Sequence, residues 1–464
     1  MLILKPRSLF VRHDAVQQTS AFPCMFDTPG FACYIQRIIN LLKKRVTMSI
    51  LAMILAGGKG ERLHPLTIHR AKPAVPFGGI YRIIDFALSN CINSGIRKIA
   101  VLPQYKSLSL DKHLRMAWNF FSGELNEYII SVPPQQRVGD KWYQGTADAI
   151  YQNIYMIEKD APDHLLVLAG DHIYKMDYAE MFKFHKEQNA DATVAAIEIP
   201  RQSATSFGVI EVAEDCRIVG FEEKPQEPKH IPGRPDTAFA SMGIYLFNTK
   251  TLLEYLKSDA LQDTSHDFGK NIIPQMMKAS RVCAYNFKDE NKKEAKYWRD
   301  VGTIDAYWEA NMDLVSVDPQ LNLYDGAWPI RTYQSQNPPA KFVFAQESKG
   351  GRLGIALDSI VSHGCIVSGG RVQNSVLSPN VRVNSYSEVQ GSILMENVDI
   401  GRHCRIRRAI IDKDVTIPPE TEIGYDLEED RKHYYVTPSG IVVIAKGTEL
   451  SEEARAAAMA DERA

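Results

Sequence analysis

The chain has 464 residues, of which 45% are apolar and 24% are charged, and its formal net charge is -2. This apolar content can fill a large core, which excludes a disordered or low-complexity chain. The balanced charge gives no general attraction to nucleic acid or to a membrane surface, and no apolar run approaches the roughly 18 residues that span a bilayer. We therefore expect a globular protein of two or three domains without a nucleic-acid or membrane partner.

The seven cysteines are scattered along the chain and include no C-x-x-C pair. A disulfide framework or a zinc site would need clustered cysteines. We therefore expect buried, unreactive thiols in a reducing compartment, which points to the cytoplasm.

Residues 1–47 differ from the rest of the chain. They are basic, lack the alternation of a strand, and contain no apolar segment that ends in a small-residue cleavage site, so they do not resemble a secretory signal. Residues 33–45 are compatible with one short basic amphipathic helix. The alternatives are an organelle-targeting helix, a disordered arm or a wrongly assigned start. Because the pattern of a folded domain begins after Met48, we place this extension outside the fold.

The first predicted strand covers residues 49–56 and ends at a turn, Gly57-Gly58-Lys59-Gly60. A continuous apolar run of this length is typical of a strand buried on both faces of a parallel sheet. Glycines after such a strand allow backbone N–H groups to approach a phosphate. Arg62 and the segment Arg70-Ala-Lys72-Pro73 add positive charge. The glycine turn alone is weak evidence, but the added charge favours a phosphate site.

A second buried strand, residues 165–169, is followed by Gly170-Asp171-His172. Open parallel sheets bind ligands beyond the carboxyl ends of their strands, so Asp171 lies where a catalytic carboxylate would be placed. The alternative is that Asp171 caps a following helix. Further strands are predicted at 96–102 and 192–197, and helices at 177–189 and 250–256. This alternation to about residue 310 predicts an α/β domain with a mainly parallel sheet.

After residue 355, aliphatic residues recur with a period of 17, in steps of six, six and five. The predicted inward positions are Ile360, Ile366, Val372, Leu377, Val383, Val389, Leu394, Ile400, Ile406, Ile411, Ile417 and Ile423. Three inward positions per coil predict a triangular parallel β-helix. The first coil is ambiguous, because matching Ser359-Ile-Val with Ser375-Val-Leu selects Val361. Open coil edges invite pairing, so we expect this piece to dock on the α/β domain or on another subunit.

Ordered motifs along the chain resemble those of the sugar-1-phosphate nucleotidylyltransferases. These motifs are Gly57-Gly58-Lys-Gly60-Glu-Arg62-Leu63, Lys72-Pro73, Gly170-Asp171 and Glu222-Glu223-Lys224-Pro225. Further motifs narrow the resemblance to the bacterial glucose-1-phosphate adenylyltransferases: Phe77-Gly-Gly79, Arg82-Ile-Ile-Asp-Phe-Ala-Leu-Ser-Asn90, Trp142-Tyr143-Gln-Gly145-Thr-Ala-Asp148, Ala169-Gly-Asp-His-Ile-Tyr-Lys175, Ala240-Ser-Met-Gly-Ile-Tyr245 and Tyr297-Trp-Arg-Asp300-Val-Gly-Thr303. The resemblance extends from about Met48 to about residue 445.

The resemblance implies a fold and a domain order. It implies a Rossmann-like nucleotidyltransferase domain at 48–310, a linker at 311–354, a left-handed β-helix at 355–445 and a tail at 446–464. The implied reaction joins ATP and α-D-glucose 1-phosphate into ADP-glucose and pyrophosphate for glycogen or α-glucan synthesis. The nucleophile is already an anion, so the task is to bring two polyanions together and to neutralise charge. Mg²⁺ as cofactor, metabolite effectors and a homotetramer are implied as well.

The same resemblance assigns roles to residues. Asp171 and Asp300 would hold Mg²⁺, and Asp171, Arg62 and Lys72 would act in catalysis. The residues implied to bind ATP are Gly57, Gly58, Gly60, Gln144, Gly145 and Asp148. Those implied to bind glucose 1-phosphate are Tyr143, Gly208, Glu223, Lys224 and Ser241. The non-functional alternatives are a salt bridge between Asp300 and Arg299 and, for Glu222-Glu223-Lys224, a solvated charged turn.

A regulatory anion site is implied between the two domains. The matching residues are Arg70, Arg82, Arg405, Arg407 and Arg408, and their alternative role is ordinary solvated charge. His69 and Pro76 stand where enteric relatives carry Lys and His. The activator therefore stays open among fructose 1,6-bisphosphate, fructose 6-phosphate, pyruvate and other metabolites.

The sequence leaves three alternatives to this function. A related enzyme would make another nucleotide sugar, and a non-catalytic regulatory subunit would keep the fold. Such a subunit would be expected to lose its metal carboxylates or phosphate-binding bases, all of which are present here. β-Helices also occur in acyltransferases that use a histidine base, but His363 and His403 are better explained as exposed corner residues.

Overall fold

The computed structural model describes residues 49–135, 142–288, 296–346, 351–448 and 450. The extension 1–47, with its expected helix, and most of the expected tail lie outside the described residues. Among the described residues, no helix has the length and apolar character needed to cross a membrane.

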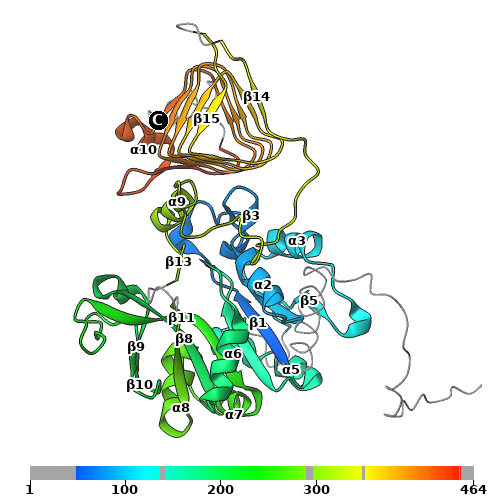
Figure 1. Cartoon of the computed structure of the whole chain (residues 1–464), viewed down its shortest axis with the longest axis vertical. Helices are drawn as coiled ribbons and strands as arrows, with labels where there is room; N and C mark the ends of the chain where they lie inside the picture. The colour runs from blue at the N-terminus through cyan, green and yellow to red at the C-terminus, as the bar shows by residue number, and fades with distance from the viewer. Residues whose placement is uncertain (1–48, 136–141, 289–295, 347–350, 449, 451–464) are drawn as a thin grey trace, which may run out of the picture. The chain divides into compact units, whose positions relative to one another are not determined.

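The first part of the fold is a nine-stranded mixed sheet whose parallel part is built around β1 (Ile50–Ala56) (Figure 1). β1 pairs in parallel with β4 (Lys98–Pro103) on one side and with β6 (His164–Ala169) on the other. The remaining strands are β5 (Tyr128–Ser131), β8 (Ala192–Pro200), β9 (Gly208–Val212), β10 (Ile218–Glu223), β11 (Thr237–Asn248) and β12 (Val282–Asn286). β11 runs antiparallel to β6, β8 and β9, whereas β12 pairs with β8 in parallel, so the sheet is parallel around β1 and mixed beyond β6. The expected α/β fold is confirmed.

Helices alternate with the strands along the chain, as the sequence pattern predicted. They are α2 (Ile84–Asn93), α3 (Leu108–Ala117), α4 (Thr146–Tyr151), α5 (Ile154–Asp160), α6 (Tyr178–Glu187), α7 (Thr249–Asp259), α8 (Ile273–Ala279) and α9 (Ile304–Asp313). Leu51, Met53 and Val167 are fully buried within the core around the parallel strands. This burial explains why β1 and β6 are apolar along their whole length.

A small two-stranded sheet fixes the position of Asp300 relative to Asp171 and His172. β7 (His172–Tyr174) follows Asp171 directly and pairs antiparallel with β13 (Trp298–Asp300), which sets Asp300 opposite His172. The alternative that Asp171 caps a helix is therefore wrong, since a strand follows it. Asp177 caps α6 instead, with its carboxylate accepting a hydrogen bond from the Ala179 N–H at 2.9 Å.

The C-terminal part is a left-handed parallel β-helix whose coils contribute to three sheets (Figure 1). The first sheet holds β14 (Lys341–Val343), β17 (Ile366–Ser368), β20 (Arg382–Val383), β23 (Asp399–Ile400) and β26 (Thr416–Ile417). The second holds β15 (Ile355–Leu357), β18 (Arg371–Gln373), β21 (Glu388–Gln390), β24 (Arg405–Arg407) and β27 (Glu422–Ile423). The third holds β16 (Ile360–Val361), β19 (Val376–Leu377), β22 (Ile393–Leu394), β25 (Ala409–Ile411), β29 (Val442–Ile444) and the antiparallel β28 (Tyr435–Val436). α10 (Leu427–His433) precedes β28, and β14 lies inside the expected linker 311–354.

The predicted inward ladder is correct from Val372 onward and wrong at two positions of the first coil. Val361 pairs with Leu377, and Val367 pairs with Val383, so these two valines replace Ile360 and Ile366 in the ladder. The corner at Gly369-Gly370 is one residue shorter than the corresponding corner of the next coil. The shorter corner moves the preceding residues by one position relative to the 17-residue period.

The β-helix packs against the catalytic domain, as expected from its open edges. Ile393, Ile410 and Val443 share one apolar cluster with Phe86 and Tyr307 of the first part of the fold. The indole N–H of Trp308 also donates a hydrogen bond to the Gly391 carbonyl at 2.9 Å. The expectation of docking on the catalytic domain is confirmed.

Candidate active site

A cavity of about 820 Å³ opens at the carboxyl ends of the parallel strands. Its walls include Ala56 at the end of β1, Leu102 of β4 and Ala169 at the end of β6. The whole glycine turn, Gly57 to Gly60, and Asp171 line it as well. This is the edge of a parallel sheet at which ligands bind.

The glycine turn combines a constrained position with an open one. Gly60 has a φ of +66°, and an added Cβ would lie 3.0 Å from Cγ2 of Thr67 and 3.2 Å from Cβ of Lys72. An added Cβ at Gly58 would meet no described protein atom within 4 Å. The backbone at Gly58 is therefore open to a ligand in the cavity.

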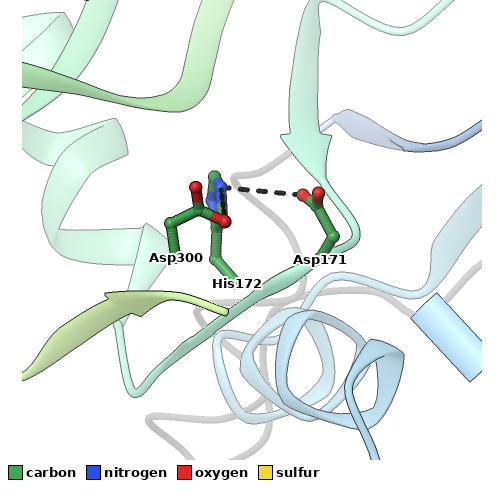
Figure 2. Close-up of side chains that lie close together, drawn as sticks. All are labelled: Asp171, His172 and Asp300. Carbon is green, nitrogen blue, oxygen red and sulfur yellow. Dashed lines mark ion pairs between the residues drawn. The ribbon is translucent and has the colours of Figure 1, made fainter. Parts of the chain in front are cut away.

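Two carboxylates and an imidazole lie together (Figure 2), and one of them, Asp171, lines the same cavity as the glycine turn. Asp171 follows β6, Asp300 ends β13, and their candidate ligand atoms lie with that of His172 within 4.8 Å of one another. Nε2 of His172 is 3.6 Å from Oδ1 of Asp171 and 4.0 Å from Oδ1 of Asp300. The pairing of β7 with β13 thus brings together two acids that are far apart in sequence.

Lys72 lies between the two carboxylates. Its Nζ donates hydrogen bonds to Oδ2 of Asp171 at 2.8 Å and to Oδ1 of Asp300 at 2.9 Å. Nη2 of Arg62 is 3.8 Å from Oδ2 of Asp300. The structure therefore brings together Arg62, Lys72, Asp171 and Asp300. Arg299 instead pairs with Asp313 at 3.1 Å. The alternative of a salt bridge between Asp300 and Arg299 is therefore wrong.

Burial and neighbouring charges have opposite effects on the pKa values of Asp171 and Lys72. Burial by itself raises the pKa of Asp171, but the Lys72 ammonium and, to a smaller extent, His172 hold the pKa of that carboxyl well below its usual range. Burial lowers the pKa of Lys72, and Asp171 and Asp300 together more than offset this, so the pKa of Lys72 is raised. Asp171 is therefore ionised and Lys72 charged at neutral pH.

The donor set fits a divalent metal ion. Two carboxylates that face one point are the oxygen ligands that hard cations prefer. The same two side chains already hold a cation here, the Lys72 ammonium.

One wall of the cavity holds three consecutive predicted residues. Tyr143, Gln144 and Gly145 all line it, and an added Cβ at Gly145 would lie 2.3 Å from the carbonyl oxygens of Ser265 and His266. The ring of Tyr143 therefore lies beside the expected nucleotide residues. Its hydroxyl donates to the Val132 carbonyl at 3.3 Å.

Asp148 is not among the residues that line the cavity. Its Oδ2 accepts hydrogen bonds from the Gln144 N–H and from Nε2 of Gln152, both at 2.8 Å. The geometry therefore makes Asp148 a support for the backbone of Gln144.

The residues expected to bind the sugar phosphate form a neighbouring group. Gly208 and Glu223 are paired across β9 and β10, and an added Cβ at Gly208 would lie 2.9 Å from Oε2 of Glu223. Nζ of Lys224 is 3.7 Å from Oε1 of Glu223, and its side chain is 62% exposed. Burial raises the pKa of Glu223, with Lys224 acting against it. Oγ of Ser241 accepts a hydrogen bond from the Gly243 N–H at 3.3 Å.

The segment Asp267–Lys270 connects this group to the cavity, and sequence reasoning gave it no role. Asp267 and Lys270 line the cavity, and an added Cβ at Gly269 would lie 2.9 Å from Oε2 of Glu223. The segment falls outside every motif quoted for the resemblance. No local signal marked it, because its position depends on contacts with Glu223 and with Thr146, whose hydroxyl bonds Oδ2 of Asp267 at 2.9 Å.

Two further residues of the site lay inside a recognised motif but received no role. An added Cβ at Gly302 would lie 2.9 Å from both Nη2 of Arg62 and Oδ1 of Asp300, so a side chain there would disturb this pair. The ring of Trp298 lies 5.0 Å from that of His172. Nε1 of Trp298 and Nδ1 of His172 are buried and have no hydrogen-bond partner among the described residues.

Arg70 and Arg82, expected at a regulatory anion site, differ in their surroundings. Arg70 is buried and donates to Oδ1 and Oδ2 of Asp412 at 2.8 and 2.7 Å, so its charge is already paired. Arg82 lines a small cavity of about 70 Å³ together with Glu396 and Lys413, and it donates to the Ala74 carbonyl at 2.7 Å.

The other three arginines lie elsewhere. Arg407 and Arg408 line a third cavity of about 440 Å³ beside Trp308. Arg405 pairs with Glu422 at 2.6 Å on an exposed face of the β-helix. The five arginines therefore do not line one common cavity in this structure.

Comparisons with known proteins agree with this architecture. A family model described as nucleotidyl transferase matches residues 51–317, and one described as a GlmU-like, C-terminal hexapeptide domain matches residues 338–444. The chain is a nucleotidyltransferase that carries a hexapeptide β-helix.

Curated relatives narrow the assignment further. The glucose-1-phosphate adenylyltransferase of Rhodopirellula baltica is 59% identical over 398 residues, which cover 85% of this chain and 89% of that protein. The enzyme of the same name from Koribacter versatilis is 58% identical over 405 residues, covering 87% and 96%. That of Methylococcus capsulatus is 55% identical over 401 residues, covering 86% and 94%. The chain belongs to the glucose-1-phosphate adenylyltransferase family.

Proposed function

We propose that this chain transfers the adenylyl group of ATP to α-D-glucose 1-phosphate, producing ADP-glucose and pyrophosphate for glycogen or α-glucan synthesis. One observation carries the proposal: Lys72 and Asp171 line a cavity of about 820 Å³ together with the open glycine turn, and Lys72 pairs there with both Asp171 and Asp300. Such a group provides the positive charge and the metal ligands that a reaction between two polyanions needs. The family membership supports the same substrates.

The reaction exchanges one bond for another at the α-phosphorus. A phosphate oxygen of the sugar attacks it, the bond to the oxygen shared with the β-phosphorus breaks, and pyrophosphate leaves with that oxygen. The nucleophile is already an anion, so the chain need not supply a strong base. When bound, Mg²⁺ held by Asp171 and Asp300 would neutralise charge on the phosphate oxygens.

The chain's own residues are proposed to position both substrates. Arg62 and Lys72 would pair with the triphosphate, and the backbone of Gly57, Gly58 and Gly60 would approach it. Gln144 and Gly145, with Asp148 as their support, would contact the nucleotide.

A second group of residues would hold the sugar phosphate. Glu223 would accept hydrogen bonds from sugar hydroxyls, and the exposed Lys224 ammonium would pair with the phosphate. Gly208, Ser241 and the ring of Tyr143 would shape the remaining surface. Their closeness to Asp267–Lys270, which lines the cavity, supports this arrangement.

Regulation and assembly are proposed in broader terms. Metabolite anions would act through Arg82 and, separately, through Arg407 and Arg408, while Arg70 would act through its contact with Asp412. Arg405, which already pairs with Glu422, is the weakest member of the proposed regulatory set. We further propose a homotetramer in the cytoplasm, with the β-helix contributing to contacts between subunits.

Pyrophosphate release measures the proposed reaction directly. We expect ATP with glucose 1-phosphate to exceed every other nucleotide and sugar-phosphate pair in a panel, in the presence of Mg²⁺. Preference for another pair would identify a different nucleotide-sugar enzyme. No release with any pair, with or without candidate metabolites, would favour the regulatory-subunit alternative. In the active enzyme, Asp171→Ala should lower kcat and change both KM values little; an effect on KM alone would contradict the catalytic role of Asp171.

A further inference from the structure

The Lys72 ammonium bonds the two carboxylates that a metal ion at this site would need. Its Nζ bonds Oδ2 of Asp171 and Oδ1 of Asp300, the same two carboxylates that form the candidate metal group with His172. The side chain of Lys72 is only 9% exposed, so both bonds lie in a partly desolvated site. Charge-assisted bonds of this kind are stronger than neutral ones.

A metal ion and the Lys72 ammonium repel each other when both bind the two carboxylates. Mg²⁺ binds carboxylate oxygens at about 2.0–2.1 Å, and Lys72 lies 2.8 and 2.9 Å from the same carboxylates. The two cations would then lie within a few ångströms of each other, where their repulsion is large in a low-dielectric site. The arrival of a metal therefore disfavours both Lys72 bonds.

A displaced Lys72 needs a new anionic partner. A buried ammonium without a partner is strongly disfavoured. Lys72 lines the same cavity as Gly58 and Arg62, so a triphosphate bound there would offer that partner. Arg62 can likewise pair with either Asp300 or the triphosphate, because its Nη2 lies 3.8 Å from Oδ2 of Asp300 and its side chain is 64% exposed.

We propose that Lys72 and the divalent metal compete for the carboxylates of Asp171 and Asp300, and that the triphosphate relieves this competition by taking over Lys72. Lys72 then weakens metal binding when no nucleotide is bound and becomes a partner of the triphosphate when one is. Metal and nucleotide binding are coupled, and the coupling acts equally in both directions. The identity of the triphosphate rests on the proposed function, whereas the competition itself needs no substrate.

The competition is tested by titrating Mn²⁺ into the full-length protein without substrates, with electron paramagnetic resonance reporting the free ion. We expect Lys72→Met to bind Mn²⁺ at least ten-fold more tightly than the wild type. Lys59→Met is the matched control, because it removes the same charge from an exposed position of the same cavity, where Lys59 lies 3.7 Å from Glu61. Equal or weaker binding by Lys72→Met, or equal tightening in the control, would overturn the proposal.

A thermal measurement guards against misfolding of the variant. Since ligands stabilise the state that binds them, Mn²⁺ should raise the Tm of Lys72→Met more than that of the wild type. An equal rise in both proteins would count against the competition.

The coupling is tested from the nucleotide side with α,β-methylene-ATP in the presence of a chelator. Asp300→Asn frees Lys72 from one bond, so this variant should bind the metal-free analogue at least three-fold more tightly than the wild type. Glu61→Gln, which removes a negative charge from the same cavity without contacting Lys72, should change the affinity less. An equal gain in affinity for the analogue in both variants would show that any lost negative charge has this effect, and it would overturn the coupling. The Mn²⁺ and pyrophosphate assays are independent, so failure of this inference leaves the proposed function separately testable.

Discussion

A substitution at Gly58 should weaken ligand binding without affecting the stability of the fold. An added Cβ would meet no described protein atom within 4 Å, but it would project into the space that a phosphate is proposed to use. We expect Gly58→Ala to raise the KM for ATP at least ten-fold while the Tm stays within about 2 °C of the wild type. Steady-state kinetics and thermal unfolding provide the two measurements.

Gly145→Ala is expected to behave differently from Gly58→Ala. An added Cβ would lie 2.3 Å from two backbone carbonyl oxygens, so this variant should lose stability as well as nucleotide affinity. An unchanged KM for ATP in Gly58→Ala would exclude the glycine turn from phosphate binding.

Lys224 offers a second prediction for a single residue. Its side chain is 62% exposed and lies 3.7 Å from Glu223, so its removal should leave the fold intact. Loss of a charge-assisted hydrogen bond to a phosphate costs roughly 1.5–3 kcal/mol. We therefore expect Lys224→Ala to raise the KM for glucose 1-phosphate by one to two decades with little change in the KM for ATP.

A nearby lysine serves as the control for Lys224. Lys229 is also exposed and pairs with Glu211 at 2.5 Å, away from the cavity. Lys229→Ala should leave both KM values unchanged. A rise in the KM for ATP alone in Lys224→Ala would move this lysine to the nucleotide side of the site.

At the scale of elements, the packing of α6 on β6 predicts a pH dependence of stability. His164 begins β6, and its ring lies 5.0 Å from Phe182 and 5.5 Å from His185, both on α6. Burial, with His185 and Lys186, lowers the pKa of His164 to about 4 from 6.5. The unfolded chain then binds a proton more readily than the folded one below pH 6.5, so stability falls as the pH falls.

The size of this effect is measurable by chemical unfolding. At pH 5 the loss that arises from His164 is about 2 kcal/mol relative to pH 7.5. His164→Phe removes the titrating group, so the variant should lose about 2 kcal/mol less than the wild type between these two pH values. Equal losses in both proteins would show that His164 titrates normally in the fold.

For the whole molecule, the ion pair between Arg70 and Asp412 joins the catalytic domain to the β-helix. Both side chains are at least 95% buried, and Nη2 of Arg70 donates to both carboxylate oxygens of Asp412, at 2.8 and 2.7 Å. Removing one partner leaves an uncompensated buried charge, which costs about 3–5 kcal/mol. We therefore expect Asp412→Ala to lower the free energy of unfolding by that amount.

Two comparisons sharpen the Asp412 prediction. Asp414 pairs with Lys446 on the surface, so Asp414→Ala should cost less than about 1 kcal/mol. The double variant Arg70→Met with Asp412→Leu removes both charges and should be more stable than Asp412→Ala alone. If the two single aspartate variants lost equal stability, the buried pair would not hold the domains together.

Features that adjacent residues encode could be predicted before the fold was known. The apolar run of β1, the glycine turn after it and the placement of Asp171 after β6 all follow from short contiguous patterns, and so does the β-helix. Sequence periodicity failed at Ile360 and Ile366, because the short corner at Gly369-Gly370 shifts the register without changing the local alternation.

Tertiary structure alone decided which distant residues meet. Lys72 is 99 residues from Asp171 and 228 from Asp300, and Arg70 is 342 residues from Asp412. Motif resemblance named the first three residues as members of one site, but it could not place the Lys72 ammonium between the carboxylates. It also could not distinguish Arg70, whose charge is paired inside the protein, from an arginine free to bind an effector. Such pairings arise when burial removes water from charged groups and each must find a partner, a condition that exists only in the folded chain.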